Sequence, residues 1–155
     1  MRLSHRGLSV EVPAGWDARI YRRREDVADE ATTHAVLHAA NFALPEDRGD
    51  FGSGAVELMG PQHVLVALLE HHPSAASTAL FANEGMPRTL AASLFSPHQL
   101  QRTIAGQAGT QVFFHESGRA FCLYVVLGSS RLRAQLLPRV HDVLRQLEIT
   151  PGAGP

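Results

Sequence analysis

The sequence predicts a mixed α/β domain of the α+β class, with a mostly antiparallel sheet of about six strands covered by a long C-terminal helix and by short helices. Three observations predict this class. Residues 111–128 have the pattern of a β-hairpin, residues 132–147 have apolar side chains at helical spacing, and the connections between the predicted strands are short. Strands joined by short connections pair antiparallel.

The hairpin is predicted from its turn and from its second arm. Ser117 and Gly118 supply the residues that a tight turn with positive φ needs. Residues 119–127 are apolar on both faces of the predicted strand, with one face formed by Phe121, Leu123, Val125 and Leu127 and the other by Ala120, Cys122, Tyr124 and Val126. A strand of this kind is covered on both sides, so a central strand is predicted.

A C-terminal helix follows the hairpin. Ser129 and Ser130 offer an N-cap, and apolar residues then recur at helical spacing, at Leu132, Leu136, Val140, Val143 and Leu147. Pro138 leaves two alternatives. Either the helix kinks there, or it begins near Gln135, which places the proline in the first turn where its missing N–H does little harm.

The remaining elements are shorter. Strands are predicted at 8–12 and 16–23, which form an N-terminal hairpin around the turn at 13–15, and at 33–42 and 62–70. The last of these also suits a helix, but its short unbroken apolar run favours a strand. Loops are predicted at 24–31 and 46–60, a short helix or irregular cover at 71–82, and a brief helix that Ser96 caps and Pro97 begins.

Composition limits the possible functions. The length of 155 residues and a hydrophobic content of 45% suit a single globular domain over residues 1–150, with a disordered tail at 151–155. The single cysteine excludes an internal disulfide and fits a reducing compartment. The chain has no lysine, which excludes lysine Schiff bases and Walker-type nucleotide hydrolysis.

Charge and hydropathy predict the location and the partners. A formal net charge of −1 argues against nucleic-acid binding, since such proteins usually carry a basic surface. Neither a signal-peptide apolar run nor a stretch long enough for a membrane span occurs. We therefore expect a cytoplasmic protein that has no membrane span.

Two segments carry a family resemblance. Residues 10–16, VEVPAGW, place a Pro-x-Gly-Trp turn after an alternating strand, which resembles the start of PsbP-like domains, and residues 111–149 are similar to the way those domains end. The resemblance implies an α/β/α sandwich that binds a partner, mostly without catalysis, and it assigns no functional residue. The chain also looks like a small bacterial family, and this second resemblance assigns it no particular activity.

The nine histidines do not predict a metal site or a cofactor. His34 and His38 lie on the predicted strand 33–42, where a separation of four residues places them about 13 Å apart, which is too far to share an ion.

Cys122 has two interpretations. A two-residue turn pairs Glu116 with Arg119 and His115 with Ala120, so that His115 shares a face with Cys122 and could serve it as a base. A cysteine within so apolar a strand is more often a small buried hydrophobic residue, and this interpretation is favoured. Glu116 and Arg119 are expected to form a surface ion pair.

The loop 49–60 is the predicted partner-binding segment. Its glycines, an exposed Phe51 and Met59 suit a mobile loop that becomes ordered on a partner, and the alternative is an ordinary long connection.

These observations predict a non-catalytic accessory or chaperone-like module that binds a protein partner. The alternative is a small-molecule-binding protein or enzyme whose pocket includes His38, His115 and Cys122. A homodimer that buries an open face of the sheet is compatible with either function.

Overall fold

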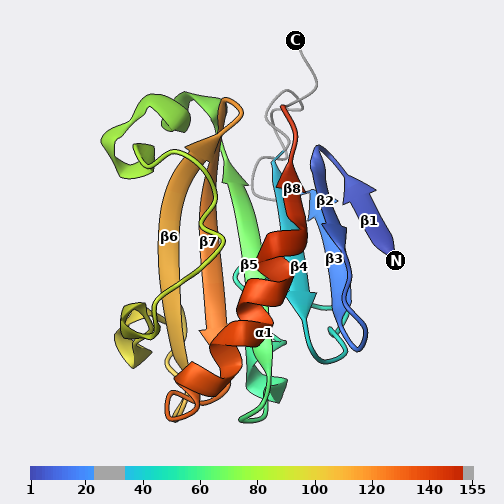
Figure 1. Ribbon diagram of the computed structural model, residues 1–155, viewed down its shortest axis with the longest axis vertical. Coiled ribbons are helices and arrows are strands. Elements are labelled where there is room, and N and C mark those ends of the chain that lie inside the picture. The colour runs from blue at the N-terminus through green and yellow to red at the C-terminus, as the bar shows by residue number, and fades with distance from the viewer. Residues whose placement is uncertain (23–33, 152–155) are drawn as a thin grey trace.

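The computed structural model describes residues 1–22 and 34–151, in which two antiparallel sheets pack with one α-helix (Figure 1). The predicted loop at 24–31 and the predicted tail beyond Pro151 lie outside the described residues. The larger sheet has the strand order β3-β4-β5-β7-β6 and the smaller sheet the order β1-β2-β8. The strands are β1 (Arg2–His5), β2 (Leu8–Glu11), β3 (Asp17–Arg22), β4 (Ala35–Ala40), β5 (Val64–His71), β6 (Ala108–Glu116), β7 (Arg119–Leu127) and β8 (Leu147–Ile149).

The predicted hairpin is confirmed as β6 and β7. Ser117 and Gly118 form its turn with φ values of 55° and 76°, and Glu116 pairs with Arg119 as predicted. β7 is buried along its whole length and lies between β5 and β6. The segment predicted as either strand or helix at 62–70 is the strand β5.

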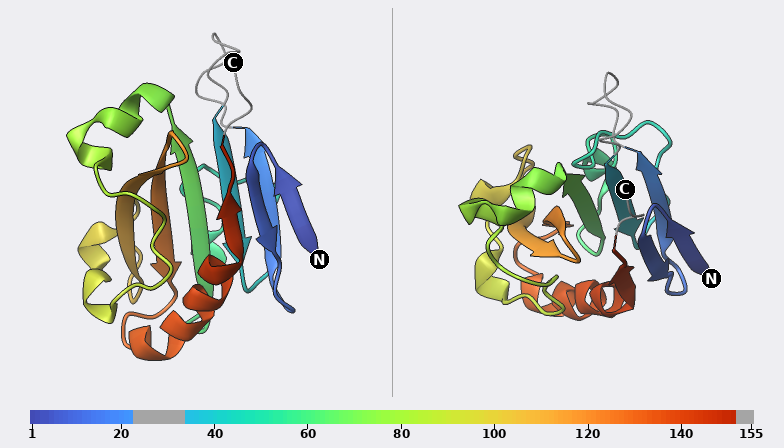
Figure 2. Two further views of the ribbon diagram at one scale, coloured as in Figure 1. Left: turned by 45° about the horizontal axis from the view of Figure 1, so that its top comes forward. Right: turned by 90° about the horizontal axis from the view of Figure 1, so that it is seen from above.

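The two faces of the larger sheet bury two separate apolar cores. The face that includes Phe121, Leu123 and Val125 packs against the C-terminal helix, whereas Tyr124 and Val126 point into the second core. Figure 2 shows the helix on one side of the sheet and the connection that follows β4 on the other. Both faces of the larger sheet are thus covered by described residues, and the predicted homodimer stays a prediction.

The second core is covered by irregular chain. Its apolar contacts come from the segments 42–59 and 100–104, and the regular structure there is the 3₁₀ turn η2 (Val56–Leu58). The short helices predicted as cover are 3₁₀ turns in the described residues: η3 (Pro73–Ser77), η4 (Ala79–Phe81), η5 (Ala92–Leu94) and η6 (Pro97–Gln99). Ser96 caps η6 as predicted, because its hydroxyl accepts a hydrogen bond from the main-chain N–H of His98.

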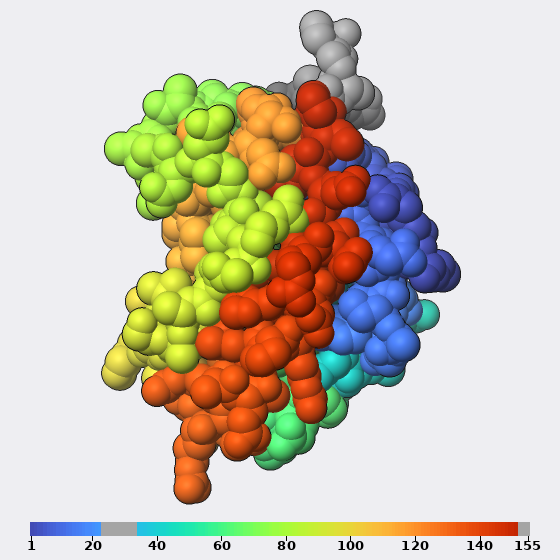
Figure 3. All heavy atoms as spheres, viewed as in Figure 1, coloured from blue at the N-terminus to red at the C-terminus, as the bar shows by residue number. Residues whose placement is uncertain are grey.

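The C-terminal helix α1 (Arg133–Gln146) begins earlier than Gln135, so Pro138 lies inside the helix and not in its first turn. The predicted serine cap is also wrong, since Leu132 is the N-cap and no side chain caps the helix start. In Figure 3, α1 lies beside the segment 86–95. Arg88 connects this segment to the helix, because its guanidinium donates to the carbonyl oxygen of Leu144 at 2.6 Å. Within the described residues, no helix is long and apolar enough to cross a membrane.

The N-terminal strands pair differently from the prediction. β2 forms its hairpin with β1, and β3 pairs with β4 in the other sheet, so the hairpin predicted between 8–12 and 16–23 is wrong. β1 is mostly exposed, and it therefore lacks the apolar alternation that identifies a strand. The sequence pattern does not indicate β8, because its first residue, Leu147, continues the helical spacing of α1.

Arg119 joins the two sheets. It is 5% exposed, and its guanidinium donates to both carboxylate oxygens of Glu70 in β5 at 2.8 and 2.9 Å. It also donates to the carbonyl oxygens of Arg6, Gly7 and Thr150, which belong to the β1–β2 turn and the residue after β8. The surface pair predicted between Glu116 and Arg119 is therefore wrong, and Glu116 instead accepts from the N–H of Met86.

Removing Arg119 tests this junction. Replacing one member of a buried ion pair typically costs about 3–5 kcal/mol, because the other charge is left buried and unpaired. We expect Arg119→Met to lower the free energy of unfolding by that amount in urea titrations. Arg145→Met, which breaks the exposed pair with Asp142, is the matched control and should cost about 0–1 kcal/mol. A loss below about 1 kcal/mol for Arg119→Met would contradict a stabilising role.

Candidate functional site

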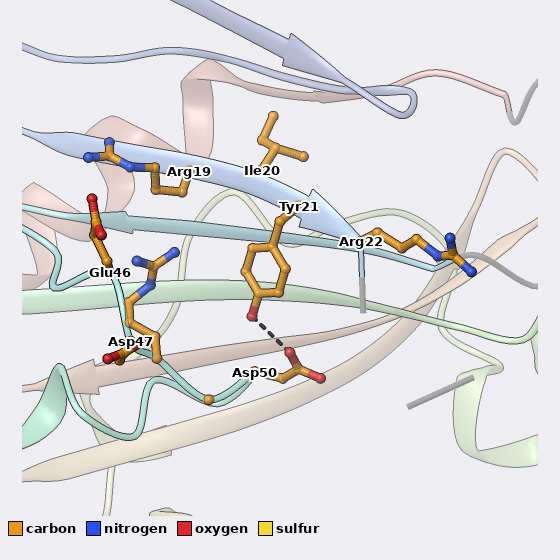
Figure 4. Close-up of a pocket in the computed structure, with 9 residues that line it drawn as sticks. Arg19, Ile20, Tyr21, Arg22, Glu46, Asp47 and Asp50 are labelled. Atoms are coloured by element: carbon orange, nitrogen blue, oxygen red, sulfur yellow. Dashed lines mark hydrogen bonds between the residues drawn. The ribbon is translucent and has the colours of Figure 1, made fainter. Parts of the chain in front are cut away.

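A pocket of about 600 Å³ lies between β3 and the segment 46–50. This volume falls within the usual range of small-ligand sites. Figure 4 shows its lining, which consists of Arg19, Ile20, Tyr21, Arg22, Glu46, Asp47, Arg48, Gly49 and Asp50.

The segment 46–50 is positioned by a side chain of β3 and by hydrogen bonds within its own loop. Asp17 in β3 accepts a hydrogen bond from the N–H of Leu44 at 2.9 Å, which fixes the start of the connection. Gly49 donates to the carbonyl of Ser53 at 2.9 Å, and a Cβ on Gly54, at φ 93°, would lie 2.5 Å from the carbonyl oxygen of Asp47. Gly54 therefore permits the close turn that brings Arg48 and Asp50 over the sheet.

His38 lies beneath this segment and anchors it from the sheet. Its side chain is fully buried in β4, with Nδ1 2.9 Å from Arg48 Nε and Nε2 2.8 Å from the carbonyl oxygen of Asp50. A guanidinium can only donate, so Nδ1 accepts, and Nε2 carries the proton that it donates to Asp50. Burial, with a smaller contribution from the charge of Arg48, lowers the pKa of His38 from 6.5 to about 4.

Tyr21 forms the wall of the pocket next to His38. The two rings meet edge to face, with their centroids 5.3 Å apart. The Tyr21 hydroxyl donates to Asp50 Oδ1 at 2.8 Å (Figure 4). The residues of the pocket wall are thus held by side-chain contacts as well as by the main chain.

Arg48 in the pocket lining has hydrogen-bond donors that the described residues do not use. Its guanidinium lies 5.9 Å from the centroid of the Tyr21 ring and donates to His38 and to the carbonyl oxygen of Pro45. Burial lowers its pKa below the ordinary value. Among the described residues no carboxylate forms an ion pair with Arg48, and its Nη2 donates to none of them. The half-buried cation therefore lines the pocket without a carboxylate counter-ion among the described residues.

The lining as a whole is electrically balanced. Three arginines and three acids contribute side chains, and Arg19 is already paired with Asp17. Glu46 and Asp47 are exposed at the rim. A balanced lining suits a small ligand with one anionic group better than a polyanion.

The residues predicted to form a pocket are spread over the sheet. His38 and Cys122 are buried and His115 is half-buried. The strand register places all three on the same face, as predicted for His115 and Cys122. His38 and His115 are nevertheless three strands apart and four residues out of register, or roughly 20 Å. None of the three lines the pocket at β3, although His38 lies directly behind it.

The predicted partner-binding residues face inward. Phe51 is half-buried, with its ring edge to face with Tyr124 at a centroid distance of 5.4 Å, and Met59 packs against the same core. The expectation that Phe51 is exposed is wrong. No regular helix or strand among the described residues covers the second core, and the side chains of Phe51 and Met59 cover part of it instead. Their role in partner binding stays a prediction.

Sequence reasoning missed Tyr21, Arg48 and Asp50. These residues come from segments that are distant in the chain, and nothing in their spacing indicates that they meet. Among the described residues, no group of three or more histidine, cysteine, aspartate or glutamate side chains is placed to hold a metal ion.

Comparisons of this chain with family models, curated proteins and solved structures find no match. The resemblance to PsbP-like domains therefore stays a prediction.

The buried histidine predicts a pH dependence of stability. The pKa of His38 is lower in the folded state than in the unfolded state, so the unfolded chain binds the extra proton first as the pH falls. Between pH 6.5 and about 4, protonation should reduce the free energy of unfolding by about 3 kcal/mol. Urea titrations at pH 7 and pH 4 should therefore show a larger loss for the wild type than for His38→Gln, which does not titrate. Equal losses would show that His38 is not buried as a neutral ring.

The burial of Cys122 predicts its reactivity. The side chain is 1% exposed and lies opposite Leu69 and Phe113. We expect it to resist a thiol reagent such as dithionitrobenzoate in the native protein and to react fully in urea, as followed by absorbance. Rapid native labelling would favour the nucleophile interpretation.

Proposed function

We propose that the protein is a non-catalytic binding protein, and that its ligand carries a carboxylate or similar anionic group held by Arg48 in the pocket beside β3. The observation that carries this proposal is the half-buried guanidinium, which lines a pocket and has no carboxylate partner among the described residues. A buried charge without a partner is unfavourable, and an anionic ligand removes that penalty.

Two further observations support binding without catalysis. Both ring nitrogens of His38 are engaged with Arg48 and Asp50, and its lowered pKa makes it a weak base. Cys122 is buried away from the pocket lining. His38 and Cys122 are thus better explained as structural residues. This disfavours the alternative of an enzyme with a pocket at His38, His115 and Cys122.

The predicted protein partner is compatible with this site, since the anionic group can belong to a polypeptide. A PsbP-like fold and a cytoplasmic location remain part of the proposal. The first depends on the Pro-x-Gly-Trp turn and the C-terminal helix, and the second on the single cysteine.

Titration with simple anions tests the proposal. Acetate, succinate and phosphate are added to ¹⁵N-labelled protein, and the resonances of the segment 46–50 and the Arg48 side chain are followed. We expect saturable shifts for at least one carboxylate, and at least about tenfold weaker binding by Arg48→Gln, since bonds to a charged donor are the stronger ones. The glutamine amide still offers a donor to His38.

Arg145→Gln is the matched control, because it removes one exposed arginine outside the pocket. It should bind like the wild type, and the melting temperatures of both variants show whether they fold. If no probe shifts these resonances, or if a folded Arg48→Gln binds equally well, the proposal is wrong.

A further inference from the structure

We infer that the protein has a second binding site, in the cover of its second core, for a small neutral molecule with an apolar body and one group, such as a hydroxyl, that both donates and accepts a hydrogen bond. The site is a pocket of about 140 Å³ formed by the segments 51–56 and 100–107 and by Tyr124 of β7. It shares no lining residue with the pocket at β3, so this inference goes beyond the proposed function.

The wall of this second pocket is mostly apolar. Phe51, Val56 and Leu100 line it, and all three belong to the second core. Engineered protein cavities of about 150 Å³ with walls of leucine, isoleucine and phenylalanine bind benzene. The size and the wall of the pocket therefore suit a molecule of about one ring.

Gln107 supplies a buried acceptor. The residue is 3% exposed, and its Nε2 donates to the carbonyl oxygen of Val56 at 2.9 Å. Because a carbonyl oxygen can only accept, this contact fixes which end of the amide is Nε2 and which is Oε1. Oε1 has no hydrogen-bond partner among the described residues. A ligand with a donor group would satisfy it.

Tyr124 supplies the complementary donor. It is 2% exposed, and its hydroxyl oxygen accepts from the main-chain N–H of Gln101 at 2.8 Å, but the described residues offer no acceptor for the hydroxyl proton. Burial raises the pKa of the Tyr124 hydroxyl above its ordinary value, so this proton is retained at neutral pH. Gln101 and Val56 both line the pocket, which places the polar ends of Tyr124 and Gln107 at its wall.

The lining favours a neutral ligand. Among the described residues that line the pocket, Arg102 alone is charged, and its exposed guanidinium donates to Glu57 at 2.7 Å. A charged ligand would therefore lose hydration without gaining a free counter-ion. A single water molecule can bond both polar groups, but it takes only about 30 Å³ and leaves most of the apolar wall uncovered. A hydroxyl or amide on an apolar body satisfies the polar groups and covers the wall.

Phenol and fluorobenzene test the inference, because they have nearly the same shape and only phenol donates a hydrogen bond. Each is titrated into ¹⁵N-labelled protein, and the main-chain resonance of Gln101, whose N–H donates to the Tyr124 hydroxyl, is followed. We expect saturable shifts, with phenol binding at least about fivefold tighter. Two neutral hydrogen bonds form with phenol, whereas fluorobenzene leaves both buried groups unpaired.

Two variants assign the preference to the two side chains. Tyr124→Phe and Gln107→Met each remove one hydrogen bond at nearly constant size, and each should reduce the preference for phenol over fluorobenzene at least about twofold. Gln135→Met, which changes an exposed glutamine of α1, is the matched control and should keep the wild-type preference. Thermal melting shows which variants fold, and the ratio in the wild type tests the inference without them.

The contrary outcomes are specific to this pocket. If neither compound gives a saturable shift, or if fluorobenzene binds as tightly as phenol, the inference is wrong. A preference for phenol that both folded variants retain would also overturn it. The anion site at Arg48 is followed through other resonances, those of the segment 46–50, so its outcome does not depend on these titrations.

Discussion

The fold depends on the buried ion pair between Arg119 and Glu70. β7 and β5 are neighbours in the larger sheet, and the pair is formed across them. The remaining N–H groups of Arg119 bind the β1–β2 turn and the end of β8, which both belong to the smaller sheet. Gly7 is required at this contact, because a Cβ there would lie 2.4 Å from Arg119 Nη1. One side chain thus connects the first and last strands of the chain to its centre.

The pocket is built on a second, smaller polar contact. His38 projects from β4 into the irregular cover of the second core and binds Arg48 and Asp50, two residues that line the pocket. The cover has little regular structure of its own, so its position depends on such tethers and on apolar contacts such as that of Phe51 with Tyr124. The same histidine orients Arg48 by accepting from Nε, while Nη2 donates to none of the described residues.

Local patterns predicted the centre of the larger sheet well. The alternation of β7, the turn at Ser117 and Gly118, and the apolar run of β5 each reflect burial that is visible in a few neighbouring residues. The partner of β2 could not be found this way, because pairing with β1 and β8 depends on contacts between the two ends of the chain.

Charged residues were the main source of error. Glu116 and Arg119 lie directly opposite in the hairpin, and that local geometry suggested a surface pair. Arg119 instead pairs with Glu70. A buried guanidinium is stable only where several acceptors satisfy its N–H groups, and such acceptors lie at the junction of the two sheets. The Arg48 site was missed for the same reason, since its environment is assembled from β3, β4 and the segment 46–50.

The covered β6 edge of the larger sheet also limits how copies of this chain can assemble. An open filament of stacked sheets requires two complementary free edges on each copy, so that every added molecule presents a new place for growth. Here the segments 83–85 and 96 occupy the β6 side. The β6 edge is therefore closed to strand addition, and a filament of stacked sheets cannot grow through it.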